Sequence, residues 1–546
     1  MAESVESSLL TVHPEYTEYT NKWPFWIDSS QGGAKFVGNQ NYLIKHPREQ
    51  DEPGAFEFRL ALAAYESHGK QVTDDWISRL LGPGLDLSIV SPAEADKRSL
   101  EFFNGVSADL DLLGTDLRSF TKKILFKAIT LGACGVVVDV SSDQPVENLS
   151  QAIISGVRPY CRAFNPADIL DWEFDRRCQL NWIKIRELAQ SPRDWNSPPS
   201  GRIPVQTEIA LASQALVRNN VYRYYILDRQ SIRRFEPIND GTSHMEAEPV
   251  FHNLGQVPFQ MFYGKSPDAG HLFTEPLIEE IYWFDHLIYN TRSGLTDLMF
   301  NQMFPILTVA VMGGNSFDKT MGVGGRRAFG YPMGSGSPPN FIGPDARLVE
   351  AHLKAIEDCE KAIKRIAKFG GMTSVDDKVR EASGRSKAFE ADPLTTQLRS
   401  IGDEQEPAFR NLFNLIHKRS AYGEKTFTGR AKFPDSIVLR GVLEEREDCA
   451  AAMEILSPSE TALKVLIQHF ANQVLPSIWT DEQRDLIMKE IEAAPLNAIL
   501  QRLSQDGGNN VGGNDDTGSS SDSGTGRPLE RAPRDQEQPG PSVRAA

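Results

Sequence analysis

The chain has 546 residues, 40% of them hydrophobic, and a formal net charge of −16 at pH 7. It is longer than the roughly 250–300 residues at which single hydrophobic cores stop growing, so we expect several domains. The acidic balance excludes a protein whose whole surface grips nucleic acid, because non-specific affinity comes mostly from Lys and Arg at phosphates. Any contact with DNA should therefore be local.

Targeting and cysteine patterns exclude further classes. No run of about 18 apolar residues occurs, and Glu3 and Glu6 stand where a secretory signal would be basic, so we expect neither a membrane span nor export. The five cysteines are scattered without a CxxC pair, which indicates neither a disulfide framework nor a zinc site. We expect reduced core residues at Cys134, Cys161, Cys178, Cys359 and Cys449.

The first half of the chain predicts helices and then strands. Apolar residues at helical spacing favour helices over 53–68 and 109–129, the second with a stripe of Leu113, Leu117 and Phe120. Segments rich in β-branched and aromatic residues follow. The expected strands are 135–140, 157–164 and 257–262, with a hairpin over 221–235 whose turn lies near Asp228.

A long helix is predicted from Glu275, because apolar residues alternate spacings of four and three. Its stripe comprises Leu277, Ile281, Phe284, Ile288, Thr291, Leu295 and Leu298. A Gly/Pro-rich insertion with a strand at 306–311 separates it from a second helix. That second stripe comprises Leu353, Ile356, Cys359, Ile363 and Ile366. A charged loop and a third helix follow, which Pro393 and Pro407 should kink or break.

The C-terminal part predicts a strand at 436–439 and then helices. Ser457 and Thr480 begin capping-box patterns, which are typical of helix N-termini. From Gln505 onward the chain is dominated by Gly, Ser, Asp, Asn and Pro. Such a tail buries too little apolar surface to offset its ordering entropy, so we expect it to be disordered.

Catalytic motifs yield near misses only. Gly264-Lys265-Ser266 ends like a phosphate-binding loop, but Phe259 stands at the position of the required first glycine. Gly322 and Gly324 begin a dinucleotide fingerprint whose third glycine is replaced by Arg327. No HExxH or GxSxG pattern occurs. We therefore expect no enzyme, and no catalytic, cofactor-binding or metal-binding residues.

Two basic clusters invite a functional reading. Lys378, Arg380, Arg385 and Lys387 surround Ser383-Gly384 in the charged loop, and Arg326 and Arg327 lie in the glycine-rich insertion. Each cluster could equally be an ordinary solvated segment or contact a protein partner.

The order of these elements resembles the portal proteins of tailed bacteriophages. Local phrases agree: RPYCRAFNPADILDW at 158–172 resembles a portal wing segment, and HNLGQVPF at 252–259 resembles the loop before the stem helix. The stem helix with Asp285, Tyr289 and Asn290, and ASGRS at 382–386, also fit. The resemblance covers about residues 50–490 and rests on the order of the phrases.

The resemblance implies an α+β, helix-rich multidomain fold with wing, stem, clip and crown around a central channel. Its parts are an N-terminal arm (1–49), the wing (50–271), stem helix 1 (272–303), the clip (304–344), stem helix 2 (345–369), the tunnel loop (370–388), a kinked helix returning to the wing (389–432), a helical crown (433–504) and a disordered tail (505–546).

It also implies a function: a homo-oligomeric ring, dodecameric in the virion, at one capsid vertex, assembled in the host cytoplasm. Double-stranded DNA would pass through the channel past Lys378, Arg380, Arg385 and Lys387. The clip, with Arg326 and Arg327, would dock the terminase large subunit and later the tail adaptor, and the ring would contact the major capsid or scaffolding protein. The alternatives are a nucleic-acid processing enzyme with an unrecognised site and another virion structural protein.

Overall fold

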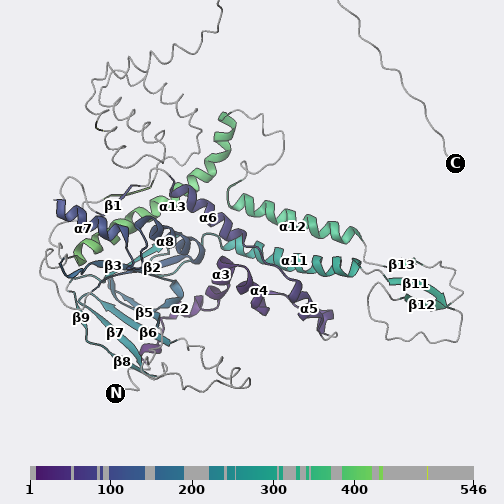
Figure 1. The fold of residues 1–546 in the computed structure, drawn as a ribbon, viewed down its shortest axis with the longest axis horizontal. Helices are drawn as coiled ribbons and strands as arrows, with labels where there is room; N and C mark the ends of the chain where they lie inside the picture. The colour runs from purple at the N-terminus through teal and green to yellow at the C-terminus, as the bar shows by residue number, and fades with distance from the viewer. Residues whose placement is uncertain are drawn as a thin grey trace, which may run out of the picture. The chain divides into compact units, whose positions relative to one another are not determined.

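The chain divides into two units, Met1–Leu439 and Arg440–Ala546. The computed structural model describes residues 8–50, 54–82, 86–89, 97–141, 154–189, 221–238, 243–252, 254–303, 306–311, 328–332, 340–342, 346–369, 384–420, 430–433 and 489. All elements named below belong to the first unit and are drawn in Figure 1. They form an α+β structure in which the sheets are mostly antiparallel.

A three-stranded antiparallel sheet, ordered β10-β2-β3, lies at the centre of the core. Its strands are β2 (Ala133–Val140), β3 (Pro159–Phe164) and β10 (Phe259–Tyr263). The first six residues of β2 are all buried, as expected for a β-branched run covered on both faces. Gly135 is required there, because an added Cβ would lie 2.7 Å from the Phe259 ring.

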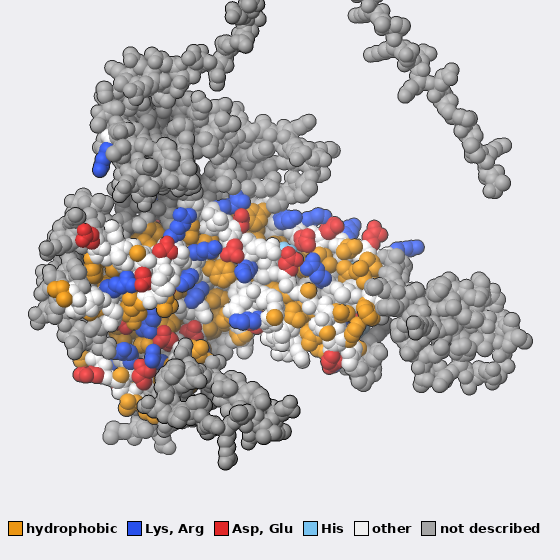
Figure 2. Space-filling view, in the orientation of Figure 1, with side chains coloured by type: hydrophobic (Ala, Val, Ile, Leu, Met, Phe, Trp, Pro, Cys, Tyr) orange, Lys and Arg blue, Asp and Glu red, His pale blue; other side chains and the backbone are white. Residues whose placement is uncertain are grey.

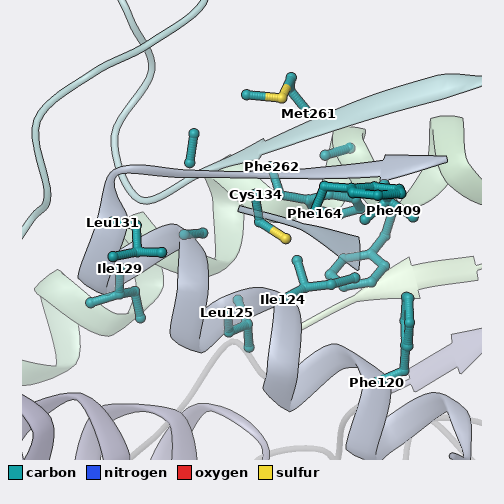
Figure 3. Close-up of a cluster of buried hydrophobic side chains, with 14 of the residues drawn as sticks. Phe120, Ile124, Leu125, Ile129, Leu131, Cys134, Phe164, Met261, Phe262 and Phe409 are labelled. Atoms are coloured by element: carbon teal, nitrogen blue, oxygen red, sulfur yellow. The ribbon is translucent and has the colours of Figure 1, made fainter. Parts of the chain in front are cut away.

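Two helices supply apolar side chains to this sheet. Helix α8 (Leu117–Leu131) contributes Phe120, Ile124 and Ile129, and α13 (Gly384–Arg419) contributes Phe409. Figure 3 shows these side chains gathered against those of the sheet. The rings of Phe409 and Phe262 lie 4.8 Å apart, so segments more than a hundred residues apart in the sequence share one core.

A second sheet has six antiparallel strands, of which β4-β5-β6-β7-β8 are successive neighbours and β9 pairs with β7. The predicted hairpin is confirmed, because β6 and β7 pair on either side of Arg229-Gln230. Strands β4 and β5 were not among the expected elements. The bounds are β4 (Ile169–Phe174), β5 (Leu180–Ala189), β6 (Val221–Asp228), β7 (Ser231–Ile238), β8 (Ser243–Glu246) and β9 (Val250–Phe251).

Both helices expected in the first half are shorter than predicted. The first, α5 (Ala55–Leu62), ends before Ala63, and a separate helix α6 (His68–Leu80) starts after the N-cap Ser67. Helix α8 begins at Leu117 because Asp116 caps it, and Asp109 and Asp111 hold the preceding turn by accepting backbone N–H groups. The prediction that Leu113 belongs to the buried stripe was wrong, since it is 84% exposed.

Helix α11 (Glu279–Met303) leads into a small mixed sheet, and α12 (Ala346–Ile366) leads out of it. This sheet contains β11 (Ile306–Val311), β12 (Ala328–Pro332) and β13 (Asn340–Ile342), with β11 in the middle. Helix α11 starts four residues later than the predicted Glu275, after a segment in which the backbone N–H groups of Leu272 and Phe273 donate to Glu15.

Helix α13 continues through Pro393 and Pro407 and is not broken. Its ribbon changes direction along its length in Figure 1, as prolines inside a helix predict. It begins at Gly384, so the last residues of the expected tunnel loop, 384–388, are helical. After it, β14 (Arg430–Lys432) pairs with β1 (Asp86–Ser88). The strand expected at 436–439, the C-terminal helices and the tail lie outside the described residues.

The remaining described elements lie in the N-terminal part and between the sheets. They are α2 (Pro14–Tyr19), α3 (Lys22–Gln31), α4 (Ala34–Gly38), η1 (Gln40–Tyr42), η2 (Pro47–Gln50), α7 (Lys97–Ala108) and η3 (Pro166–Asp168). Among the described residues no helix is long and apolar enough to cross a membrane. Cys134 and Cys161 are buried, but Cys178 is exposed in the turn between β4 and β5, so its expected place in the core was wrong.

Candidate functional site

The most distinctive feature of the fold is the pair formed by α11 and α12, which pack against each other. Ile281, Ile288 and Leu295 are buried on α11, and Ile356 and Ile363 on α12, all in one continuous core cluster. These residues confirm the predicted stripe at heptad spacing. Leu353 lies off the stripe and is 48% exposed, so its predicted burial was wrong.

Helix α11 has a second buried face, and this face is polar. Asp285, whose side chain is completely buried, accepts a hydrogen bond from the His68 Nδ1–H over 2.7 Å and another from the backbone N–H of Gly69 over 3.0 Å. The carboxylate therefore sits at the N-terminus of α6, where the helix dipole and free N–H groups favour a negative charge. An added Cβ at Gly69 would lie 2.8 Å from the Tyr282 ring, so the two helices meet closely.

Burial and pairing act against each other at this contact. Burial raises the pKa of Asp285, because a carboxylate is costly in a dry environment, although the bonds from His68 and Gly69 partly offset this effect. The hydrogen bond to Asp285 raises the pKa of His68. An aspartate paired with a cation ordinarily has a lowered pKa, so burial dominates at Asp285. Both groups thus bind protons more readily in the folded state than in the unfolded chain.

A second polar contact holds the middle of α11. The Arg59 guanidinium donates to both oxygens of Glu49, over 2.6 and 2.9 Å, and to the carbonyl of Ile44 over 2.6 Å. Its remaining nitrogen reaches the Ser293 hydroxyl at 3.4 Å. Arg59 is buried, and such bidentate pairs have a fixed geometry. This contact ties α5 and the segment before it to α11.

The sequence did not indicate these polar partners. Asp285 and His68 are 217 residues apart, and Arg59 and Ser293 are 234 residues apart, so no local spacing links them. The sequence offered one indication of a buried polar contact: Asp285 lies between positions 281 and 288 of the apolar stripe.

A third face of α11 is apolar and exposed. Trp283 is 58% exposed and Leu287, one turn later on the same face, is 51% exposed. A Cβ added to Gly294 would meet nothing within 4 Å, so a neighbouring helix could approach closely at this point. Figure 2 shows hydrophobic side chains grouped over the end of the pair that leads towards β11. Exposed apolar groups of this kind mark interaction surfaces.

The sequence-predicted site residues are only partly placed. Arg385 and Lys387 lie in the first turn of α13 and not in a loop. Lys378 and Arg380, and likewise Arg326 and Arg327 between β11 and β12, lie outside the described residues. The relative position of the two basic clusters therefore lies outside the described residues.

The described residues contain no group of three or more His, Cys, Asp or Glu side chains that could hold a metal ion. Their polar clusters join elements of the fold to one another. The exposed apolar face of α11 is thus the remaining candidate for an interaction surface. No protein-family model matches the chain, and no curated protein matches it in sequence.

Proposed function

We propose that this chain is a portal protein of a tailed bacteriophage, a ring-forming subunit of the vertex through which DNA enters and leaves the capsid. The observation that carries the proposal is the paired helices α11 and α12. The small sheet of β11, β12 and β13 lies between them in the chain, and they pack on the α+β part of the first unit. Helix α13 then packs against strands β10 and β2 of that part. This order of elements resembles the stem, clip and wing of portals.

Ring assembly gives the exposed face of α11 a role. A closed ring needs a heterologous interface, in which each subunit presents two different surfaces to its two neighbours. Trp283 and Leu287 would supply one of these surfaces, because their burial against the next copy removes apolar area from water. The polar anchors at Asp285 and Arg59 would keep that surface at a fixed angle to the body.

The charge of the chain suits a channel that DNA passes through without adhering to it. Twelve copies would carry 12 × −16, or about −190 formal charges, and an acidic channel repels duplex phosphates. Local Lys and Arg would then make weak contacts that are blind to sequence. Lys378, Arg380, Arg385 and Lys387 are proposed for this role, and their places in the channel follow from the resemblance.

The partners proposed on the same ground are the terminase large subunit, a tail adaptor, and the major capsid or scaffolding protein. The terminase would supply the energy for packaging, so the chain itself is proposed to be a structural virion component and not an enzyme. Arg326 and Arg327, in the proposed clip at 304–344, would contribute to docking the terminase.

Negative-stain microscopy and mass measurement of the purified full chain test the proposal. We expect closed rings with a central hole and a mass near twelve copies. Monodisperse monomers with nuclease or ATPase activity would support a processing enzyme instead. Closed shells or open tubes would indicate a capsid or tail subunit.

A further inference from the structure

Residues 8–50 cross the first unit as one continuous strap and contact three separate regions. We propose that this N-terminal strap couples the six-stranded sheet to helix α11, and that its contact with Lys184 is a release point that lets the two regions move separately. The proposal concerns a single chain and holds whether or not rings form.

The outer anchor of the strap lies on the six-stranded sheet. Lys184 of β5 has a side chain that is only 2% exposed, and its ammonium donates to the carbonyls of Ser8 and Thr11, over 3.0 and 2.6 Å, and to the Thr11 hydroxyl over 3.0 Å. Leu9 is buried in a small cluster of its own with Leu170, Tyr224 and Phe235. The next residue in contact, His13, donates its backbone N–H to Leu170.

The middle anchor lies just before α11. The buried Glu15 carboxylate accepts hydrogen bonds from the backbone N–H groups of Leu272 and Phe273, the shortest over 2.8 Å. Lys22, in the first turn of α3, pairs with Glu275 over 2.7 Å. Both contacts fix the chain that leads into α11, and Trp23 and Trp26 bury this part of the strap in the main core.

The inner anchor lies on α11 itself. The His286 Nε2–H donates to the Tyr42 carbonyl over 2.7 Å, and the Asn290 amide oxygen accepts the Ile44 backbone N–H over 2.8 Å. Glu49 then pairs with Arg59, which also reaches Ser293. The strap is therefore bonded to α11 over more than one turn.

The three anchors differ in strength, and this difference locates the release point. The middle anchor is buried in the large core, and the inner anchor adds the stacked rings of Phe36 and Tyr65 and the buried Arg59–Glu49 pair. The outer anchor consists of Lys184, the His13–Leu170 backbone bond and a four-residue apolar cluster that Tyr16 joins to the large core. If residues 8–12 left the sheet, Lys184 would keep only Asp171, at 3.5 Å. Segments with few buried contacts are the ones that open locally in a native protein. The outer end should detach while the inner end stays bound.

Hydrogen exchange of the full chain tests the coupling. Lys184→Met removes the three donated bonds but keeps an unbranched side chain, and Leu9→Ser weakens the same anchor from the strap. We expect both variants to speed exchange of amides in 8–13 by roughly tenfold, while the amides of 271–290 and of β2 stay unchanged because the middle and inner anchors remain bound. Arg233→Met is the matched control, because Arg233 lies on the same sheet and pairs only loosely with Glu246, at 3.8 Å.

Two results would overturn the proposal. If exchange rises equally in 271–290, the strap leaves α11 together with the sheet, and the Lys184 contact is not a separate release point. If protection is lost throughout β2 and α8 in either variant, the anchor belongs to the global core and is no release point. Lys184→Met leaves the carbonyls of Ser8 and Thr11 without their donor, which could prevent folding. Leu9→Ser keeps the test valid in that case, because Leu9 lies outside the main cluster.

Discussion

The core around β2 and the pair of α11 and α12 differ in how completely their apolar side chains are buried. In the core, Phe409, Phe262 and Ile124 are completely buried, and the described sheet and helices cover one another. On α11, one face is buried against α12, a second is held by the polar anchors at Asp285 and Arg59, and a third leaves Trp283 and Leu287 exposed. Among the described residues, the core is closed within one chain, whereas we propose that the helix pair is positioned by the chain and completed by a neighbouring copy.

The largest expected effect concerns the exposed face. Trp283→Glu should lower self-association at least about a hundredfold, because burying an unpaired carboxylate costs several kcal/mol. The unfolding free energy of the single chain should fall by no more than about 1 kcal/mol, because the Trp283 ring packs on Phe25 but is more than half exposed. Sedimentation velocity measures the first quantity and urea denaturation the second.

Leu113→Glu is the matched control for that experiment, because Leu113 is the more exposed of the two residues and lies in the turn before α8. It should leave both association and stability unchanged. Unimpaired association of Trp283→Glu, or equal loss in both variants, would contradict a specific role for this face of α11.

Within the core the expectation is reversed. Phe409→Ala should lower the unfolding free energy by about 3–5 kcal/mol, because it removes a completely buried ring that contacts Phe262 and leaves a cavity. Leu287→Ala, at an exposed side chain on α11, should cost less than about 1 kcal/mol in the same urea titration. Similar losses in both variants would remove the distinction between the two regions.

Substitutions on the polar face of α11 should lower the unfolding free energy by an intermediate amount. Asp285→Ala leaves the partly buried His68 ring N–H and the buried Gly69 N–H without their acceptor and should cost about 3 kcal/mol. Asp285→Asn should cost less, because its amide oxygen can still accept one of these bonds. Equal losses in the two variants, measured by urea denaturation at pH 7, would show that packing and not hydrogen bonding holds α11 to α6.

The smallest effect expected is a dependence on pH. The folded-state pKa of His68 and of Asp285 is raised, so the folded chain holds more protons than the unfolded chain. The stability contributed by His68 is complete below its ordinary pKa of about 6.5 and is lost as the pH rises through the folded value. The parent should therefore lose more unfolding free energy from pH 6 to pH 9 than His68→Gln does. A steeper fall in the variant would contradict the assignment.

Local patterns predicted the elements that are regular in sequence. The valine run of β2, the β6–β7 hairpin and the buried stripes of α11 and α12 each follow from the periodicity of one segment. Strand β4 contains Asp171 and Glu173 among its apolar residues, and α6 begins with His68-Gly69 and carries several charges. Their burial depends on distant partners, so no single window of sequence indicates them.

The candidate site was predictable only in outline. Heptad spacing predicted the two helices. It did not predict which face of α11 stays exposed, because that depends on which faces the rest of the chain covers. Lys184 and Glu15 illustrate the same limit. The shortest hydrogen bond of Lys184 goes to a residue 173 positions away, and Glu15 accepts the N–H of Leu272 from 257 positions away. Contacts of this kind are set by tertiary structure, which residue spacing does not encode.

The central claim is that copies of this chain close into a ring through the α11–α12 pair. Cryo-electron microscopy of the assembled full chain tests this claim most directly, because it locates α11 relative to its neighbour. We predict a closed ring in which Trp283 and Leu287 are buried against the next subunit and the paired helices surround a central channel. A ring or filament that leaves this face exposed to solvent, or a chain that stays monomeric, would contradict the account.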